Sequence, residues 1–207
     1  MKIQAVEFAG MVARPGAPPP GRLPQVAFAG RSNVGKSSLI NRLLGRTRSP
    51  IAHVSVTPGR TQQIHFYLVR AVGSRGGDFD FYLVDLPGYG FAHVPLEVRQ
   101  RWRPLIERYL SGTPELRGVV QLIDARQGPT TEDRRMMQYL AGQGLPTLFA
   151  LTKVDKLKAS DRQKMLAGIV EALDVDEEQI VPFSARTGEG RDVLLGCLED
   201  LLRQGGE

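Results

Sequence analysis

The chain has 207 residues, 42% of them hydrophobic, which supports a single domain with one substantial core. Its 27 basic and 22 acidic side chains leave a net charge of +5, compatible with an anionic partner, and its single cysteine, Cys197, excludes an intrachain disulfide framework. No apolar run is long enough to span a bilayer and the N-terminus lacks a secretory signal pattern, so we expect a cytoplasmic protein with no membrane partner.

The first 24 residues divide into two parts. IQAVEFA, residues 3–9, is either a short edge strand or a docking arm, and RPGAPPPGRLP, residues 14–24, is too rich in Pro and Gly to form a regular helix. We therefore expect an N-terminal arm and connector over residues 1–24, a single domain over residues 25–204 and a short tail over residues 205–207.

From residue 25 onward, strand-like apolar runs alternate with helical patterns. The expected strands are VAFAG (26–30), IHFYLVR (64–70), FDFYLVD (79–85), LRGVVQLID (116–124), PTLFALT (146–152) and QIVPFS (179–184). Helices are expected near residues 36–45, 96–111, 130–143, 159–173 and 190–203, the last holding Cys197 as a buried residue. This alternation predicts an α/β fold with a mostly parallel, six-stranded sheet and helices on both faces.

One strand of this sheet should run against the others. IHFYLVR and FDFYLVD are separated only by AVGSRGGD, residues 71–78, which is a Gly-rich loop of hairpin length. The two strands are therefore expected to pair antiparallel.

A phosphate-binding loop follows the first strand. The pattern Gly-x-x-x-x-Gly-Lys-Ser lies between VAFAG and the helical SSLINRLLG, a context in which backbone N–H groups and a helix N-terminus surround phosphate oxygens. Lys36 would neutralise the outer phosphates and Ser37 would bind Mg²⁺, whereas the alternative is a Gly-rich turn with a surface lysine. The expected contacts are Gly30, Arg31, Ser32, Asn33, Val34, Gly35, Lys36, Ser37 and Ser38.

Three further predicted strands end in polar residues, at the edge of the sheet where ligands of open α/β folds bind. Asp85, after the strand FDFYLV, can hold Mg²⁺, and the backbone N–H of Gly88 can meet a terminal phosphate. The three groups of strand-end residues are Asp85, Leu86, Pro87 and Gly88; Thr152, Lys153 and Asp155; and Ser184, Ala185 and Arg186.

Asp155 supplies the step that selects the base. A carboxylate has two acceptors at the spacing of the ring N–H and exocyclic amino group of guanine, whereas adenine presents no such pair of donors. The stem of Lys153 can lie along the purine, and the N–H of Ala185 can meet the guanine carbonyl. The sequence therefore predicts a site for GTP or GDP.

The segment VTPGRTQQ, residues 56–63, is expected to sense the terminal phosphate, because it lies between the phosphate-binding loop and Asp85. Thr61, directly before a strand, is our choice for a Mg²⁺-binding hydroxyl, and Thr57 is its competitor. We expect the triphosphate to order this segment and hydrolysis to loosen it.

The motifs GRSNVGKSS, TPGRTQ, VDLPGYGFA, LIDARQGPTTED, LTKVDKL and FSA, with RW…YL between them, resemble in order and spacing the EngB (YihA/YsxC) group of bacterial GTPases, in the translation-factor-related class. The resemblance extends from about Val26 to the C-terminal helix. It implies a Ras-like P-loop GTPase domain that assists assembly of the large ribosomal subunit, with ribosomal RNA and ribosomal proteins as partners. We expect a monomer.

The resemblance also implies a set of site residues. It adds Gly59, Arg60, Thr61, Gln62 and Gln63 to the nucleotide contacts, and places the metal on Ser37 and Thr61, with Asp85 in its shell. Lys36, Thr61 and Gly88 are the candidate catalytic residues. The helix after VDLPGYGFA contains Pro104, so it is expected to kink or begin there.

Catalysis is expected to be slow, because Tyr89 follows Asp85-Leu86-Pro87-Gly88 where Ras-like enzymes usually place a water-orienting glutamine. Several relatives with an asparagine at the position of Asn33 hold a potassium ion there, so K⁺ is a candidate cofactor. The alternative is that the Asn33 amide merely hydrogen-bonds within the loop.

Two groups of arginines could meet an anionic partner, although a solvated charged face is the simpler interpretation of each. They are Arg42, Arg46, Arg48 and Arg60, and Arg99, Arg101, Arg103 and Arg108. The leading hypothesis is a slow GTPase switch, and the alternative is a nucleotide-gated RNA-binding module in which hydrolysis is incidental. A membrane-associated GTPase ranks last, because the chain has no lipidation motif.

Overall fold

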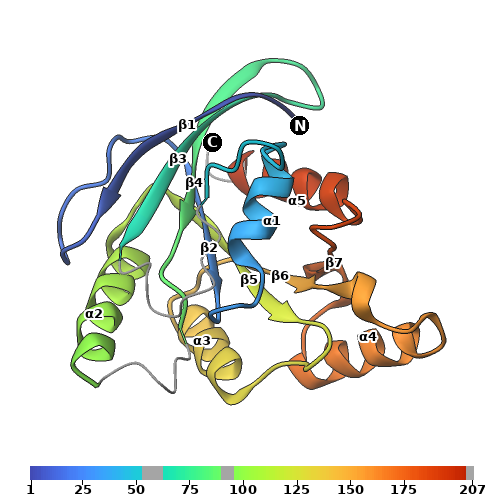
Figure 1. The fold of residues 1–207 in the computed structure, drawn as a ribbon. Coiled ribbons are helices and arrows are strands. Elements are labelled where there is room, and N and C mark those ends of the chain that lie inside the picture. The colour runs from blue at the N-terminus through green and yellow to red at the C-terminus, as the bar shows by residue number, and fades with distance from the viewer. Residues whose placement is uncertain (53–62, 90–95, 204–207) are drawn as a thin grey trace.

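The computed structural model describes residues 1–52, 63–89 and 96–203. Seven strands form one sheet in the order β1-β3-β4-β2-β5-β6-β7 (Figure 1). The strands are β1 (Lys2–Val12), β2 (Gln25–Gly30), β3 (Ile64–Val72), β4 (Asp78–Asp85), β5 (Leu116–Asp124), β6 (Thr147–Thr152) and β7 (Ile180–Pro182). The α-helices are α1 (Lys36–Leu43), α2 (Leu96–Gly112), α3 (Thr131–Gly142), α4 (Ala159–Leu173) and α5 (Arg191–Arg203).

The sheet is mostly parallel, as predicted, and β3 is the strand that runs against the others. β2 pairs in parallel with β4 and β5, whereas β3 pairs antiparallel with β4 through the predicted hairpin. All six residues of β2 are buried, which suits a central strand covered on both faces. The ends of β2, β4, β5 and β6 therefore meet at one edge of the sheet.

The prediction of six strands is wrong by one, because the N-terminal segment adds the edge strand β1. β1 pairs antiparallel with β3, with Val6 opposite Val69, and only Val6 and Val12 of β1 are buried. A strand with so few buried positions has a weak hydrophobic pattern, so the sequence left an edge strand and a docking arm as alternatives. The structure decides for the strand. The division of the chain into an arm, a domain and a tail stays a prediction.

Helices cover both faces of the sheet (Figure 1). Alternate residues of the strands point to opposite faces, so Phe28 packs in the core beneath α1 and α5, while Ala27 packs in the core beneath α2 and α3. A third apolar cluster joins α4 to β5 and β6. The predicted helices are confirmed, and Cys197 is a half-buried residue of α5.

Helix α2 runs through Pro104 and does not begin there. Proline has no N–H to donate, so the helix loses one backbone hydrogen bond at this position, and packing must compensate for the loss. Leu105 and Ile106 are buried against the sheet directly after the proline. Within the described part of the chain, no helix is long and apolar enough to cross a membrane.

Candidate functional site

The phosphate-binding loop, residues 30–37, has the backbone geometry that its pattern predicts. Asn33 (φ 61°) and Gly35 (φ 103°) are left-handed, and Gly35 leads directly into α1 at Lys36. A Cβ at Gly30 would lie 2.9 Å from Cγ1 of Val34, so any other residue there would force a neighbouring side chain to shift. The turn thus delivers the N-terminus of α1 to the edge of the sheet, where it can face an anion.

Lys36 and Asp85 form a buried ion pair at this edge. Their side chains are 9% and 4% exposed, and Lys36 Nζ donates to Asp85 Oδ1. The parallel pairing of β2 with β4 places Phe28 opposite Asp85, which fixes the carboxylate beside the loop. Burying two charges is costly unless they are paired, so the contact between the two groups offsets the cost of burying each of them.

The residues after β4 lie along the loop. Tyr89 N–H donates to the carbonyl of Gly30 and Ser32 N–H donates to the carbonyl of Tyr89, both at 3.2 Å. Gly88 is so close to the loop that a Cβ there would lie 2.7 Å from Oγ of Ser32. The segment from Asp85 to Gly88 therefore borders the phosphate-binding loop, as predicted.

The side chain of Tyr89 points toward the start of α3. Its hydroxyl donates to Asp133 Oδ1 at 3.0 Å and accepts a hydrogen bond from Gln121 Nε2 at 3.1 Å. Burial, and next the charge of Asp133, raise the pKa of the Tyr89 hydroxyl well above its ordinary value. Arg31 Nε lies 3.3 Å from Oδ2, the other carboxylate oxygen of Asp133. Tyr89 thus connects the loop with α3 as a neutral hydrogen-bond donor.

Sequence reasoning missed Asp133 and Gln121. One local signal could have found Asp133, since Thr130-x-x-Asp133 is a capping box: the Thr130 hydroxyl accepts from the N–H of Asp133, and the Asp133 carboxylate accepts from the N–H of Thr130. Gln121 is fully buried inside β5 and has no local signal, because its partners come from other elements.

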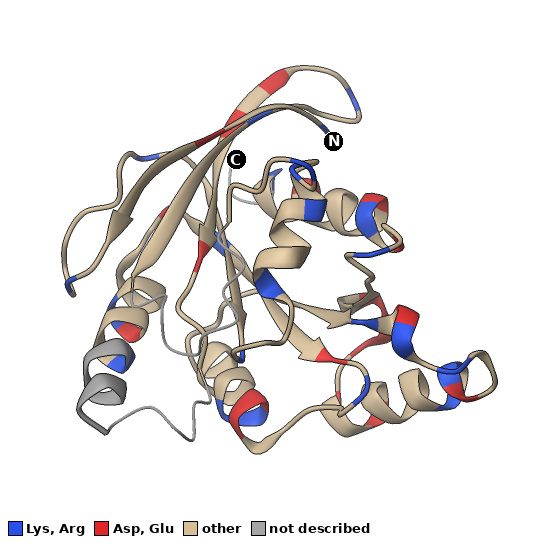
Figure 2. Ribbon diagram, in the orientation of Figure 1, with Lys and Arg blue, Asp and Glu red and all other residues tan. Residues whose placement is uncertain are grey.

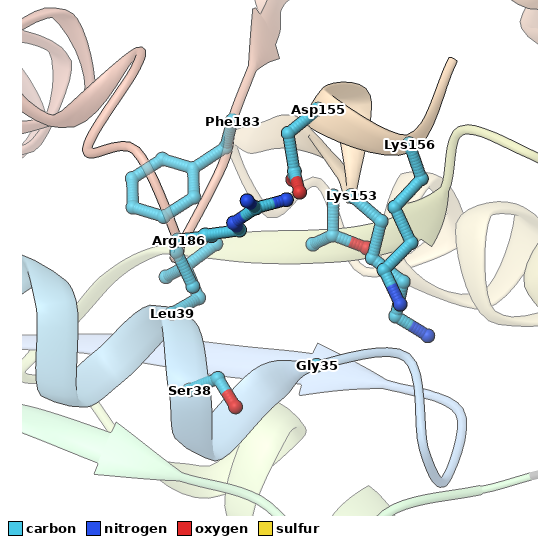
Figure 3. Close-up of a pocket in the computed structure, with 10 residues that line it drawn as sticks. Gly35, Ser38, Leu39, Lys153, Asp155, Lys156, Phe183 and Arg186 are labelled. Carbon is cyan, nitrogen blue, oxygen red and sulfur yellow. The ribbon is translucent and has the colours of Figure 1, made fainter.

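A cavity of about 370 Å³ opens beside the loop (Figure 3). This volume is within the range of small-molecule pockets. Three predicted motifs from separate parts of the chain surround it. The lining residues are Gly35, Ser38 and Leu39 from the loop and α1; Thr152, Lys153, Asp155 and Lys156 from the end of β6; and Phe183, Ala185 and Arg186 from the end of β7.

The wall formed by the end of β6 is fastened to the phosphate-binding loop. Thr152 Oγ1 donates to the carbonyl of Val34 at 2.7 Å, and Lys153 Nζ donates to the carbonyl of Asn33 at 2.6 Å. Lys153 is left-handed at φ 62° and also pairs with Asp124 Oδ2 at 2.8 Å. Lys153 therefore lies along the cavity wall with its ammonium held at two points.

Asp124, the last residue of β5, is a second acid that sequence reasoning missed. Burial opposes ionisation of Asp124, but hydrogen bonds from Arg126 and Lys153 outweigh it and lower the pKa of this carboxyl to about 2. The carboxylate is therefore charged at neutral pH and holds Lys153. The signal was available, because Asp124 ends a predicted strand at the same edge of the sheet as Asp85.

Asp155 faces the cavity (Figure 3), and the end of β7 holds its carboxylate. Ser184 Oγ donates to Asp155 Oδ1 at 2.7 Å, and the N–H of Thr187 donates to Ser184 Oγ at 3.1 Å. Ser184 is fully buried, so its hydroxyl is shielded from water. A carboxylate fixed in this way can accept two donors from the edge of a guanine base.

The structure thus brings together the predicted residues of the loop and of the ends of β4, β6 and β7. Gln63 lies directly before β3. Some predictions lie outside the described residues, namely those on Thr57, Gly59, Arg60, Thr61 and Gln62. Among the described residues, no group of three or more His, Cys, Asp or Glu side chains could hold a metal ion by itself.

Basic residues are interspersed with acidic ones along the ribbon (Figure 2), and two of the arginines that follow the loop are bound within the chain. Arg42 donates to the carbonyls of Ala185 and Arg186, and Arg46 donates to the carbonyl of Val6. These two side chains bind within the chain, Arg48 is exposed, and Arg60 lies outside the described residues. A role of this group in binding an anionic partner stays a prediction.

Two sequence families match parts of the chain. The family described as 50S ribosome-binding GTPase matches residues 25–153, and the elongation factor Tu GTP binding domain matches residues 106–204. The probable GTP-binding protein EngB of Gemmatimonas aurantiaca is 48% identical over 203 residues, which are 98% of this chain and 95% of that protein. The probable GTP-binding protein EngB of Desulforamulus reducens is 45% identical over 207 residues, 100% of this chain and 97% of that protein.

Solved structures share the fold. The crystal structure of a probable GTP-binding protein EngB has a TM-score of 0.64 at 24% identity, over 87% of this chain and 99% of that one. The crystal structure of a single-residue variant of Aquifex aeolicus Era bound to GDP·AlF₄⁻ has a TM-score of 0.70 at 23% identity, over 89% of this chain and 58% of that one. Since close relatives cover nearly the whole chain, it belongs to the EngB family of GTP-binding proteins and is a P-loop GTPase whose ligand is a guanine nucleotide.

Proposed function

We propose that this GTPase is a nucleotide-dependent switch in assembly of the large ribosomal subunit, and that it hydrolyses GTP slowly without a partner. The observation that carries the ribosomal part is the match of residues 25–153 to a family described as 50S ribosome-binding GTPase. The partners we propose are the subunit or its precursor, through ribosomal RNA and ribosomal proteins, and the protein acts as a monomer.

In this proposal the nucleotide lies across the edge of the sheet. Its phosphates meet backbone N–H groups at the N-terminus of α1 and the ammonium of Lys36, while its base enters the cavity beside Asp155 and Ala185. Lys36 neutralises charge on the outer phosphates, and the N–H of Gly88 meets the terminal phosphate. Thr61 completes the proposed catalytic set.

The residues at the loop suit Mg²⁺. Ser37 offers a hydroxyl in the first turn of α1, and Asp85 offers a buried carboxylate whose present partner is a cation, Lys36. Mg²⁺ prefers such hard oxygen ligands, and commonly takes one or two from the protein and the rest from phosphates and water. The metal would supply charge neutralisation on the phosphate oxygens. Ser37, Asp85 and Thr61 are the protein ligands that we propose.

Slow hydrolysis is supported by the contacts of Tyr89. A glutamine at this position could orient an attacking water through its amide, but the Tyr89 hydroxyl already donates to Asp133. Its raised pKa also keeps it protonated at neutral pH, so it cannot act as a base. The ribosomal particle or an ion would therefore supply the missing stabilisation.

Binding to the particle should depend on nucleotide and salt together. In co-sedimentation with large ribosomal subunits and their precursors, we expect tighter association with GTP than with GDP, and weaker association as salt rises, because contacts of arginines with RNA phosphates release counterions. Replacing Arg99, Arg101 and Arg103 together by glutamine should weaken binding by at least about tenfold at about 0.1 M salt.

A matched triple variant controls for net charge. Arg135, Lys158 and Lys164 are exposed on α3 and at α4, so replacing them by glutamine removes the same charge elsewhere. Equal binding with GDP and GTP at every salt concentration would contradict the switch. If GTP and a non-hydrolysable analogue support a full assembly cycle equally, the alternative of a nucleotide-gated RNA-binding module is correct.

We also propose K⁺ as a cofactor at Asn33. This exposed residue is left-handed in the phosphate-binding loop, where its amide oxygen could meet a monovalent cation beside the phosphates. A cation there would stabilise charge that develops between the outer phosphates during hydrolysis. We expect faster turnover in potassium than in sodium chloride at equal ionic strength.

Replacing Asn33 should remove this preference with little loss of GTP affinity. Asn33→Gly tests the amide without backbone strain, since glycine adopts φ 61° freely, and Asn33→Ala adds the strain as a comparison. Identical turnover of the unchanged protein in the two salts, alone and with ribosomal particles, would refute the potassium site.

A further inference from the structure

The cavity wall formed by Ala185 and Arg186 is fastened to helix α1 by one side chain. Arg42 Nε donates to the carbonyl of Ala185 and one of its terminal nitrogens donates to the carbonyl of Arg186, both at 2.6 Å. Arg42 is half-buried, and 143 residues separate it from Ala185. An arginine can bridge two acceptors in this way because its donors form a rigid planar fork.

Contacts in the opposite direction strengthen this attachment. Arg191, the first residue of α5, donates through Nε to the carbonyl of Arg42 at 3.1 Å. Gly188, in the loop between β7 and α5, lies close to the stem of Arg42, since a Cβ there would lie 3.9 Å from Cδ of Arg42. The end of α1 is therefore bound both to this loop and to the start of α5.

A backbone hydrogen bond of the loop and the contact with Arg42 together determine the direction of two backbone donors. A peptide unit is planar and trans, so its C=O and N–H point in opposite directions. The carbonyl of Ser184 accepts from the N–H of Gly188 at 2.8 Å, which orients the N–H of Ala185, and Arg42 fixes the next peptide unit, which carries the N–H of Arg186. Within the described part of the chain, neither of these two N–H groups has an acceptor.

The same helix serves the phosphate end of the site. α1 begins at Lys36, and Ser38 and Leu39 line the cavity within the first turn. Arg42 lies six residues beyond Lys36, which is about 9 Å along a helix. One rigid element therefore connects the phosphate-binding loop to the wall that faces the base.

We infer that Arg42 is a positioning residue for the guanine base: it holds the backbone of Ala185 and Arg186 so that their N–H groups meet the carbonyl oxygen of the base. This inference rests on the proposed placement of the base beside Asp155 and Ala185. It assigns to Arg42 a role within the protein, where the sequence suggested only a surface cluster of positive charge.

The test compares Arg42→Met with Arg46→Met. Both changes remove one positive charge near the end of α1 and keep an unbranched stem. Arg46, however, donates to Val6 in the edge strand β1, which does not line the cavity. The measurements are the dissociation constants and release rates of GDP and IDP, the KM and kcat of GTP hydrolysis, and the thermal unfolding midpoint.

For Arg42→Met we expect GDP and IDP to bind about tenfold more weakly and to leave faster, because a wall contact shared by both bases is lost. The ratio of IDP to GDP affinity should not change, since the 2-amino group that distinguishes guanine meets Asp155 and not this wall. KM for GTP should rise while kcat stays within about twofold. Arg42→Lys has one ammonium in place of the guanidinium fork. Its affinity for GDP should therefore lie between that of the unchanged protein and that of Arg42→Met.

Three outcomes of the binding measurements would overturn the inference. They are unchanged GDP and IDP affinities in Arg42→Met, an equal loss in Arg46→Met, or a changed IDP to GDP ratio, which would mean that Arg42 acts through Asp155. If kcat falls as many fold as the affinity and the thermal unfolding midpoint falls with it, Arg42 has a general structural role, and the inference is also overturned. The proposed placement of the base is tested separately, with Asp155→Asn. If this variant keeps the base preference of the unchanged protein, the placement itself is wrong.

Discussion

Replacing Asp155 by asparagine is expected to reverse the choice of base. The carboxylate is an acceptor at both oxygens, and Ser184 Oγ already holds Oδ1 at 2.7 Å, so its orientation is fixed. An asparagine presents a donor where guanine presents its amino group, and a carbonyl at that position of the base, as in xanthine, restores a hydrogen bond. We expect the affinity ratio of GTP to xanthosine triphosphate to fall by about a thousandfold, because mispaired buried polar groups are costly.

Equilibrium titration with both nucleotides measures this ratio. Asp161→Asn is the matched control, since Asp161 is an exposed acid in the first turn of α4 and does not line the cavity. Its ratio should be that of the unchanged protein. A preference for GTP that survives in Asp155→Asn would show that another group reads the base.

Gly190→Ala is expected to destabilise the protein more than any other single methyl group added at a described glycine. Gly190 has φ +77°, and a Cβ there would lie only 2.0 Å from the backbone oxygen of Pro182. The obstruction is backbone that belongs to β7, so it cannot be relieved by rotating a side chain. We expect a loss of about 3 kcal/mol or more in the free energy of unfolding.

Gly196→Ala provides the control in the next helix. Gly196 lies inside α5, and a Cβ there would meet nothing within 4 Å, so alanine should raise the free energy of unfolding by about 0.5–1 kcal/mol through helix propensity. Denaturant unfolding of the two variants without nucleotide measures both effects. Equal stability of the two variants would mean that the loop between β7 and α5 rearranges freely.

The architecture of the site follows from the order of apolar runs and polar strand ends along the chain. Short apolar runs that alternate with helical patterns predict parallel strands. Parallel strands joined by helices bring their carboxyl ends to one edge of the sheet. The residues that directly follow those runs were therefore expected to lie close together. The structure places the described ones around one loop and one cavity. The hairpin of β3 and β4 was equally predictable, because its short Gly-rich loop permits only an antiparallel pair.

The residues that support the site could be identified only from the packing of separate elements. The Tyr89–Asp133 pair spans 44 residues, the Lys153–Asp124 pair 29 and the Arg42–Ala185 contact 143. A local pattern records which face of an element is apolar, but it does not record which polar atom another element brings within about 3 Å. The choice between an edge strand and a docking arm for β1 stayed open for a related reason. The pairing of β1 with β3 is made by backbone groups that every residue carries.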